Sequence, residues 1–272
     1  MKLLHTFFLA VSALYTFVTA QEPKYVFAHM VVGDTAAHDV TTWGIDISLA
    51  QAAAIDAFAL NIAYGDPNVP TQVANAFSAA AANGYTFKLF FSFDYLGGTG
   101  PWPAEDVASY LNEYKSHPAY FLYTGIPFVG TFEGPDNAGD WAPGGTIRSS
   151  VGDLYFVPTW TSIGATGVAG YADSIQGAFP WAMWPVGANN MTDGNDLYWQ
   201  ATLPGKTYMM GVSPWFFHSS SYGGSVPWVE RGDDLWASRW AETLDVNPDF
   251  VEFVPSSSLH SFCDVANEGV GL

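Results

Sequence analysis

The chain has 272 residues and carries 8 lysines and arginines against 26 aspartates and glutamates, a net charge of −18. This acidic balance excludes nucleic acid and anionic membranes as expected partners, because both repel a negatively charged surface. The only cysteine is Cys263, so no disulfide can form within the chain and the fold must depend on its core. The 11 tryptophans suit the stacking of sugar rings as well as a hydrophobic core.

The first 20 residues, MKLLHTFFLAVSALYTFVTA, predict a secretory signal peptide. A lysine near the start precedes a short apolar stretch, and Val18, Thr19 and Ala20 place small residues at the expected cleavage site. The stretch is too short to span a membrane comfortably, and no other long uncharged apolar run follows it. We therefore expect a secreted, extracellular protein that does not insert into a membrane.

Eight short apolar runs follow the signal segment, separated by turns and helical patterns. They cover residues 25–33, 57–63, 87–95, 127–134, 154–160, 177–185, 208–217 and 249–254. Their nearly continuous hydrophobicity is typical of parallel strands that are buried on both faces. Strands that alternate with helices predict an α/β fold, and the number of units predicts a TIM (β/α)8 barrel. We assign residues 21–254 to this single domain.

Three of the connecting segments carry clear helix signals. Residues 103–117 begin with a proline, continue with two acids and end before Pro118. Residues 71–84 are rich in alanine and end at a glycine. Residues 233–244 begin with two aspartates and space their apolar residues three to four apart. Each segment predicts an α-helix on the outside of the barrel.

Two carboxylates stand at the ends of strongly apolar strands. Asp94 is the acid in LFFSFDY, and Glu133 follows the apolar residues of VGTFEGPD. Side chains at the carboxyl ends of barrel strands form the active sites of this fold, and a pair of carboxylates is what most glycoside hydrolases use. Asp94 and Glu133 are therefore candidate catalytic residues. The alternative is structural, in which they cap loops or pair with Arg231.

Several other polar and aromatic residues fall at strand ends and are candidate substrate-binding residues. They are His29, Asp66, Trp160, Trp181, Trp184 and Trp215. A histidine in a strand is also commonly a satisfied core residue, and the tryptophans suit the core as well. We expect sugar stacking from one or two of the four tryptophans. The six histidines form no zinc-binding motif, so neither a metal nor another cofactor is expected.

Asn190, Met191 and Thr192 form an N-glycosylation sequon in a loop rich in glycine and asparagine. In a secreted protein such a loop is accessible to the glycosylation machinery. We therefore predict a glycan on Asn190.

Several blocks of the sequence resemble glycoside hydrolase family 71, the fungal α-1,3-glucanases that are also called mutanases. The blocks are YVFAHMVVG, DISLAQAAAIDAFALNIAYGDP, KLFFSFDY, TFEGPDNAGDW, MMGVSPWFF and RGDDLWASRW, in that order along residues 24–254. The resemblance implies a TIM barrel that hydrolyses α-1,3-glucosidic bonds of fungal cell-wall glucan or mutan. It also implies a secreted enzyme without a metal cofactor, and we expect a monomer.

The family blocks coincide with the candidate residues. FSFDY and TFEG contain Asp94 and Glu133, NIAYGDP contains Asp66, and RGDD contains Arg231, Asp233 and Asp234. The resemblance therefore implies Arg231 and Asp233 as further substrate-binding residues. It also implies an inverting mechanism, for which the two carboxyls lie about 6.5–9.5 Å apart and leave room for a water molecule.

The sequence departs from the family pattern after Val254. In the family, a block reading Trp-Asn-Asp-Tyr-Gly-Glu-Ser follows the eighth strand and supplies two more acids, which are the leading candidates for the catalytic pair. If they form that pair, Asp94 and Glu133 would instead position the substrate or orient water. Here residues 255–272 read PSSSLHSFCDVANEGVGL, which we interpret as a divergent tail after an incomplete last βα unit. Three interpretations stay open: an α-1,3-glucanase, an inactive carbohydrate-binding barrel, and a non-functional truncated gene product.

Overall fold

The computed structural model describes residues 24–184, 190–214, 217–218, 228–229 and 234–254. The predicted signal peptide, the tail 255–272, and the candidate residues Trp215, Arg231 and Asp233 lie outside the described residues. The predicted signal peptide and the predicted incomplete last unit therefore stay predictions.

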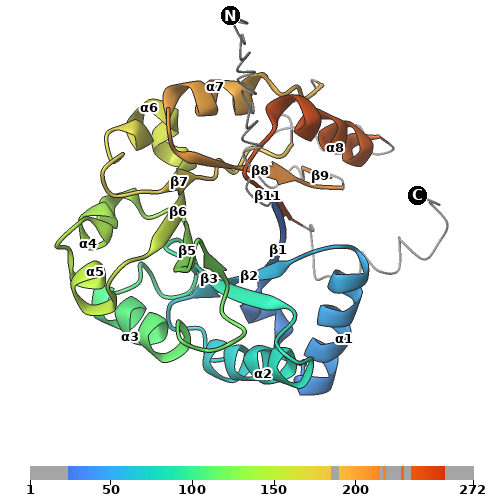
Figure 1. Ribbon diagram of the computed structural model, residues 1–272, viewed down its shortest axis with the longest axis vertical. Helices are drawn as coiled ribbons and strands as arrows, with labels where there is room; N and C mark the ends of the chain where they lie inside the picture. The colour runs from blue at the N-terminus through green and yellow to red at the C-terminus, as the bar shows by residue number, and fades with distance from the viewer. Residues whose placement is uncertain (1–23, 185–189, 215–216, 219–227, 230–233, 255–272) are drawn as a thin grey trace, which may run out of the picture.

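Within the described residues, eight parallel strands follow one another around a ring (Figure 1). They are β1 (Tyr25–Val31), β2 (Ala57–Ala63), β3 (Lys88–Asp94), β5 (Ile126–Phe132), β6 (Tyr155–Thr159), β7 (Gly177–Ala178), β8 (Thr207–Val212) and β11 (Phe250–Phe253). Backbone pairing runs in the order β6-β5-β3-β2-β1-β11-β8-β7. Between β6 and β7, the amides of Gln176 and Phe179 donate to the carbonyls of Phe156 and Pro158, at 2.9 and 3.1 Å. The predicted α/β class is confirmed.

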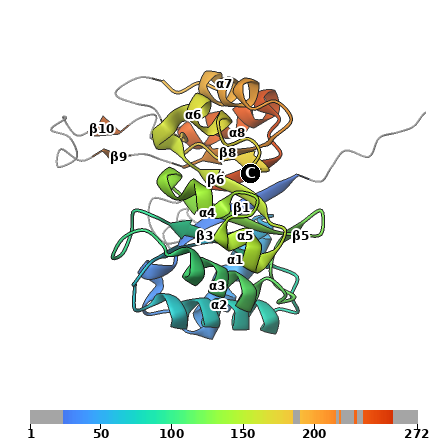
Figure 2. The ribbon, with the colours of Figure 1, turned by 90° about the vertical axis from the view of Figure 1, so that its left-hand side faces the viewer.

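Helices surround the ring on its outside (Figures 1 and 2). They are α1 (Val40–Ala52), α2 (Val69–Ala82), α3 (Ala104–Tyr114), α4 (Ala138–Trp141), α5 (Thr146–Val151), α6 (Gly164–Ala169), α7 (Gly194–Thr202) and α8 (Leu235–Val246), with 3-10 turns η1 (Val32–Thr35), η2 (Pro135–Asn137) and η3 (Thr161–Ile163). The three predicted helices are present as α2, α3 and α8, each displaced by a few residues from its predicted bounds.

Three short strands in the part of the chain that the structure describes stand outside the parallel ring. Strand β4 (Leu122–Tyr123) pairs antiparallel with the start of β5. Strands β9 (Phe217–His218) and β10 (Trp228–Val229) pair antiparallel with each other. They follow β8 in the chain and project away from the helices and strands of the barrel (Figure 2).

The sixth strand is shorter than its apolar run predicts. Residues 177–185 are apolar throughout, but only Gly177 and Ala178 pair with β8. Pro180 has no amide hydrogen to donate to a neighbouring strand, so the ladder ends before it. The residues after β7 are released to form part of the barrel mouth.

An aromatic layer fills the interior of the ring. Phe27, Phe90, Phe128 and Phe250 come from four different strands, and all four are buried. Their ring centroids lie 4.8–5.6 Å apart, from 4.8 Å for Phe90 and Phe128 to 5.6 Å for Phe27 and Phe250. Edge-to-face and stacked contacts of this kind stabilise a core beyond the area they bury. The barrel centre is therefore packed with side chains and is not a channel.

A polar layer follows directly above the aromatic one. Side chains two positions apart on a strand point to the same face of the sheet. The residues two positions after each of the four phenylalanines therefore also point into the ring. They are His29 on β1, Ser92 on β3, Gly130 on β5 and Glu252 on β11. Two further positions along β3 and β5 bring Asp94 and Phe132 to the mouth. The change from aromatic to polar side chains marks the end of the barrel where chemistry can occur.

Candidate active site at the carboxyl ends of the strands

A buried histidine and a buried glutamate form the centre of the polar layer. Nδ1 of His29 lies 2.8 Å from Oε1 of Glu252, a hydrogen bond in which the carboxylate accepts. His29 is 6% exposed and Glu252 is 2% exposed. A carboxylate this deeply buried requires a partner, and His29 supplies it. Glu252 is not among the residues predicted from the sequence.

Trp181 covers this pair from the side of the mouth. Its ring centroid lies 5.1 Å from that of His29 and 5.0 Å from that of Phe132, edge-to-face in both cases. The backbone amide of Trp181 donates to Oγ1 of Thr161 at 2.8 Å, which holds the segment after β7 against η3. Trp181 is half-buried, so one part of its ring packs on the barrel while another part stays accessible. Its predicted role in substrate binding stays a prediction.

Asp94 organises the loop that follows its own strand. Oδ1 accepts hydrogen bonds from the amides of Leu96 and Gly97, at 2.9 and 2.8 Å. A Cβ atom on Gly97 would lie 2.9 Å from Oδ2 of Asp94, so the carboxylate sits tightly against the glycine. Asp94 is half-buried in the layer above Ser92. The loop-capping role that the sequence left open is therefore present, at a position that also faces the mouth.

Glu133 is held by the loop after the neighbouring strand. Its carboxylate accepts from the amide of Ser162 at 3.0 Å and from the Ser162 hydroxyl. The backbone of Glu133 is left-handed, with φ of 51°, and Gly134 follows with φ of 91°. A Cβ on Gly134 would lie 2.4 Å from the ring of Tyr95, so only glycine fits there. Glu133 thus joins β5 to η3, and its side chain is 9% exposed at the edge of the mouth.

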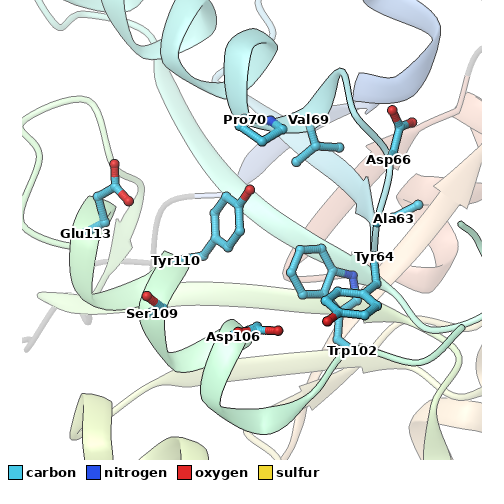
Figure 3. A pocket seen from close by; sticks show the side chains of 11 residues that line it. Ala63, Tyr64, Asp66, Val69, Pro70, Trp102, Asp106, Ser109, Tyr110 and Glu113 are labelled. Carbon is cyan, nitrogen blue, oxygen red and sulfur yellow. The ribbon is translucent and has the colours of Figure 1, made fainter. Parts of the chain in front are cut away.

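Asp66 lies away from the barrel axis, in the turn between β2 and α2. Its Oδ1 accepts from the amide of Asn68 at 2.8 Å, and a Cβ on Gly33 would lie 2.3 Å from its Oδ2. The carboxylate therefore packs against the loop after β1. Asp66 also lines a cavity of about 410 Å³ between α2 and α3 (Figure 3). Asp94 and Glu133 do not line this cavity.

The tryptophans at strand ends differ in their accessibility. Trp160 is buried, with its ring against Phe156 and Tyr171. Its indole Nε1 has no hydrogen-bond partner within the described residues. This burial favours a core role for Trp160. Trp181 and Trp184 are half-buried, and their ring centroids lie 6.2 Å apart.

Trp181 and Trp184 line a cavity of about 590 Å³ beside α6 and α7. Tyr198 and Trp199 of α7 contribute further aromatic surface to it, and the predicted glycosylation site Asn190 lies on its wall. Asn190 is exposed, as a glycan acceptor must be. A cavity that combines aromatic walls with a few amide and hydroxyl groups is suited to a polyhydroxylated ligand.

The described part of the chain contains neither a cluster of metal-binding side chains nor a helix that could cross a membrane. No group of three or more histidine, cysteine, aspartate or glutamate side chains in residues 24–184, 190–214 and 234–254 is arranged to hold a metal ion. None of the helices that the structure describes is both long and apolar enough to cross a membrane.

The sequence profile of glycosyl hydrolase family 71 matches residues 22–255. The chain belongs to glycosyl hydrolase family 71. A mutanase of Penicillium rubens is 36% identical over 239 residues, which cover 86% of this chain and 51% of the relative. A glucan endo-1,3-alpha-glucosidase of Schizosaccharomyces pombe is 34% identical over 264 residues, which cover 93% of this chain and 60% of the relative. This family 71 chain thus spans about half to three fifths of the length of these curated relatives.

Solved structures of other glycosidases share the fold of this family 71 chain. A GH99 endo-alpha-mannosidase from Bacteroides thetaiotaomicron superposes with a TM-score of 0.65 at 13% sequence identity, covering 86% of this chain and 83% of that one. A GH5 cellulase from an Icelandic hot spring isolate gives a TM-score of 0.54 at 12% identity, covering 86% and 74%. At such low identity the likeness establishes the fold alone.

Proposed function

We propose that this chain is the barrel of a secreted glycoside hydrolase that cleaves α-1,3-glucosidic bonds in fungal cell-wall glucan or mutan. Membership of family 71 and the activities named for the two fungal relatives support this substrate. The observation that carries the proposal is Trp181, which stands half-buried over the His29–Glu252 pair and beside an aromatic cavity. A sugar ring stacked on this surface would lie across the mouth of the barrel.

The proposed chemistry uses a pair of carboxyl groups. One carboxylic acid protonates the oxygen of the leaving sugar, and the other carboxylate activates a water molecule on the opposite face of the ring. Asp94 and Glu133 are the pair proposed from the sequence, and they stand on neighbouring strands at the mouth. Glu252 adds a third carboxyl one layer below Asp94. Inversion, a monomeric state and a glycan on Asn190 belong to the same proposal.

A second candidate function is binding of the glucan without cleavage. It is favoured by the hydrogen bonds that already engage both proposed catalytic carboxylates, from Leu96 and Gly97 to Asp94 and from Ser162 to Glu133. Residues that hold loops in this way have a structural task whether or not they take part in catalysis. Under this alternative, Trp181 and Trp184 would retain glucan at the mouth.

An Asp94→Asn variant separates the two functions. Asparagine keeps the oxygen that accepts from Leu96 and Gly97, so the loop is retained while the acid is lost. The full chain and the variant are incubated with insoluble α-1,3-glucan, and both released sugar and bound protein are measured. The hydrolase proposal predicts that Asp94→Asn binds normally and releases sugar about 10²–10⁴-fold more slowly. Asp173→Asn, at an exposed aspartate, is the matched control.

Binding of the unmodified chain without any released sugar would reject hydrolysis and support the second function. Release by Asp94→Asn at the normal rate would remove Asp94 from the catalytic pair and leave the glucan assignment in place.

A further inference from the structure

The cavity between α2 and α3 lies on the opposite side of the barrel from the aromatic cavity beside α6 and α7. In Figure 1 the helices α2 and α3 stand at the bottom of the ring, and α6 and α7 stand at the top. The α2–α3 cavity has a volume of about 410 Å³, within the range of about 300–1,000 Å³ that small-molecule sites occupy. Among the proposed residues that the structure describes, only Asp66 lines it.

Three aromatic side chains form one wall of this cavity. The ring of Trp102 stands edge-on between those of Tyr64 and Tyr110, with centroid distances of 5.2 and 5.4 Å. The indole Nε1 of Trp102 donates to the carbonyl of Ile62 at 3.0 Å, which fixes the central ring to β2. Trp102 is buried, whereas Tyr64 and Tyr110 are half-buried and present ring surface to the cavity. Figure 3 shows Tyr110 reaching from α3 towards Val69 and Pro70 of α2.

The polar side chains of the cavity come mainly from one face of α3. Asp106, Ser109 and Glu113 stand three and four residues apart, which places them on the same side of a helix. Asp66 adds a carboxylate to the lining from the turn between β2 and α2. Asp106 lies beside Tyr64 in the lining, and its hydrogen-bonding and electrostatic effects raise the pKa of Tyr64. The cavity therefore combines hydrogen-bond acceptors with aromatic surface.

The loop that carries Tyr64 is fixed in place by the next loop. The amide and the hydroxyl of Thr99 both donate to the carbonyl of Tyr64, at 2.8 and 3.2 Å. Gly98 has a φ of 64°, and a Cβ there would lie 2.0 Å from the same carbonyl. Gly65 has a φ of 76° and would place a Cβ 2.5 Å from Oγ1 of Thr99. Two glycines thus let the loops approach closely, so the aromatic wall is formed before any ligand arrives.

We propose that the α2–α3 cavity binds one end or one branch of a neutral glucan chain, as a second carbohydrate site away from the barrel axis. Pyranose rings present C–H faces to aromatic walls, and their hydroxyl groups donate to carboxylates. That the sugar is a glucan rests on the proposed function. That the ligand is a carbohydrate rests on the aromatic and carboxylate side chains of the cavity itself.

The charged side chains around the cavity argue against an anionic ligand and against a metal ion. The ionisable residues that line it are two tyrosines and three acids, without a lysine or arginine, so an anionic ligand would be repelled. A bound metal ion needs several acids that converge on one point, and the described residues contain no such group of three. Dispersed carboxylates with aromatic rings between them suit the many hydroxyl groups of a sugar.

The test measures by calorimetry the binding of an α-1,3-linked glucotriose to the full chain. Every protein in the test carries Asp94→Asn, so that the sugar is not cleaved during the titration. The sugar is recovered afterwards and checked to be intact. Ser109→Trp places a large side chain in the cavity from an exposed position on α3. We expect this variant to lose one of two binding sites per chain. Tyr64→Ala is expected to weaken binding at the same site by about tenfold, and Tyr64→Phe by less, because it keeps the ring.

Ser78→Trp is the matched control, because it adds the same side chain at an exposed position of α2 that does not line the cavity. Thermal melts establish that each variant is folded before its affinity is compared. Unchanged stoichiometry and affinity in both Ser109→Trp and Tyr64→Ala would overturn the proposal, as would binding of Ca²⁺ at this cavity in place of the sugar. Absence of glucan hydrolysis by the unmodified chain would count against the proposed function only, because this binding experiment does not depend on turnover.

Discussion

His29 and Glu252 join the first strand of the barrel to the last described one through a buried hydrogen bond of 2.8 Å, although they are 223 positions apart in the chain. We expect Glu252→Leu to lower the free energy of unfolding by about 1–3 kcal/mol, because His29 then keeps a buried polar atom without its partner. The double variant His29→Phe, Glu252→Leu should recover part of this loss, because neither polar group is left. Urea unfolding of both variants measures the difference.

The double variant also separates stability from function. If it regains stability but does not cleave glucan, the pair is retained for its part in the site. A double variant that is less stable than Glu252→Leu alone would show that His29 is held by contacts other than the one to Glu252.

Glu133 and Ser162 allow a sharper test of the predicted catalytic role. Glu133→Gln and Ser162→Ala both weaken the link between β5 and η3, so we expect similar shifts in melting temperature. A catalytic carboxylate predicts that Glu133→Gln slows glucan hydrolysis by about 10²–10⁴-fold, while Ser162→Ala has a much smaller effect. Equal losses of activity in the two variants would mean that Glu133 only positions the loop. Initial rates at matched fractions of folded protein provide the comparison.

The fold could be predicted from the sequence because its strands are continuous apolar runs, separated by residues that mark turns and helix starts. The run FKLFFSFDY became β3, and the proline and acids of residues 103–106 mark the start of α3. The prediction was poorest at residues 177–185, where the apolar pattern persists but Pro180 interrupts the ladder. A run of apolar side chains predicts that a segment is buried. It does not predict whether the backbone amides of that segment are available to pair with a neighbouring strand.

The site could be predicted only in part, because its centre depends on contacts between distant segments. Asp94 is visible in the sequence as an acid at the end of an apolar strand. Glu252 reads as an ordinary alternating position in FVEFV, and its importance depends on His29. Trp160 and Trp181 both follow strands, yet one is buried and the other covers His29. That difference arises from the direction in which the chain turns after each strand, which spacing alone does not encode.

Trp184 provides a test of the aromatic surface beside α6 and α7. We expect Trp184→Ala to reduce retention on insoluble α-1,3-glucan several-fold, because the cavity loses one of its ring faces. Tyr85→Ala is a suitable control, since Tyr85 is an exposed aromatic residue before β3, at the other end of the strands. Sedimentation with the washed polymer measures the bound fraction. Equal retention of the two variants would exclude Trp184 from the glucan surface.

A buried ion pair holds α8 against α7. Arg239 is fully buried and donates to both carboxylate oxygens of Asp196, at 3.0 and 3.3 Å, and to the carbonyl of Gly211 at 2.9 Å. Asp196→Ala should lower the free energy of unfolding by about 3–5 kcal/mol, because the buried guanidinium then keeps only the more exposed Glu242 as an anionic partner. Glu242→Gln, which alters the more exposed partner of Arg239, should cost about 0–1 kcal/mol. Chemical unfolding that shows equal costs would contradict this assignment.

Alkaline pH should destabilise the protein through its buried tyrosines. Burial raises the pKa of Tyr155 to about 12, with smaller contributions from Tyr123 and Asp249, while its hydrogen bond to Thr207 acts in the opposite direction. The ordinary pKa is 10.0, so the folded chain holds this proton more tightly than the unfolded chain. The resulting stability is fully present below about pH 10 and is lost as the pH rises towards about 12. Tyr155→Phe should therefore flatten the decline in urea unfolding midpoint over this interval, whereas Tyr198→Phe, at an exposed hydroxyl, should leave it unchanged. An equally steep decline in Tyr155→Phe would assign the alkaline transition to other buried groups.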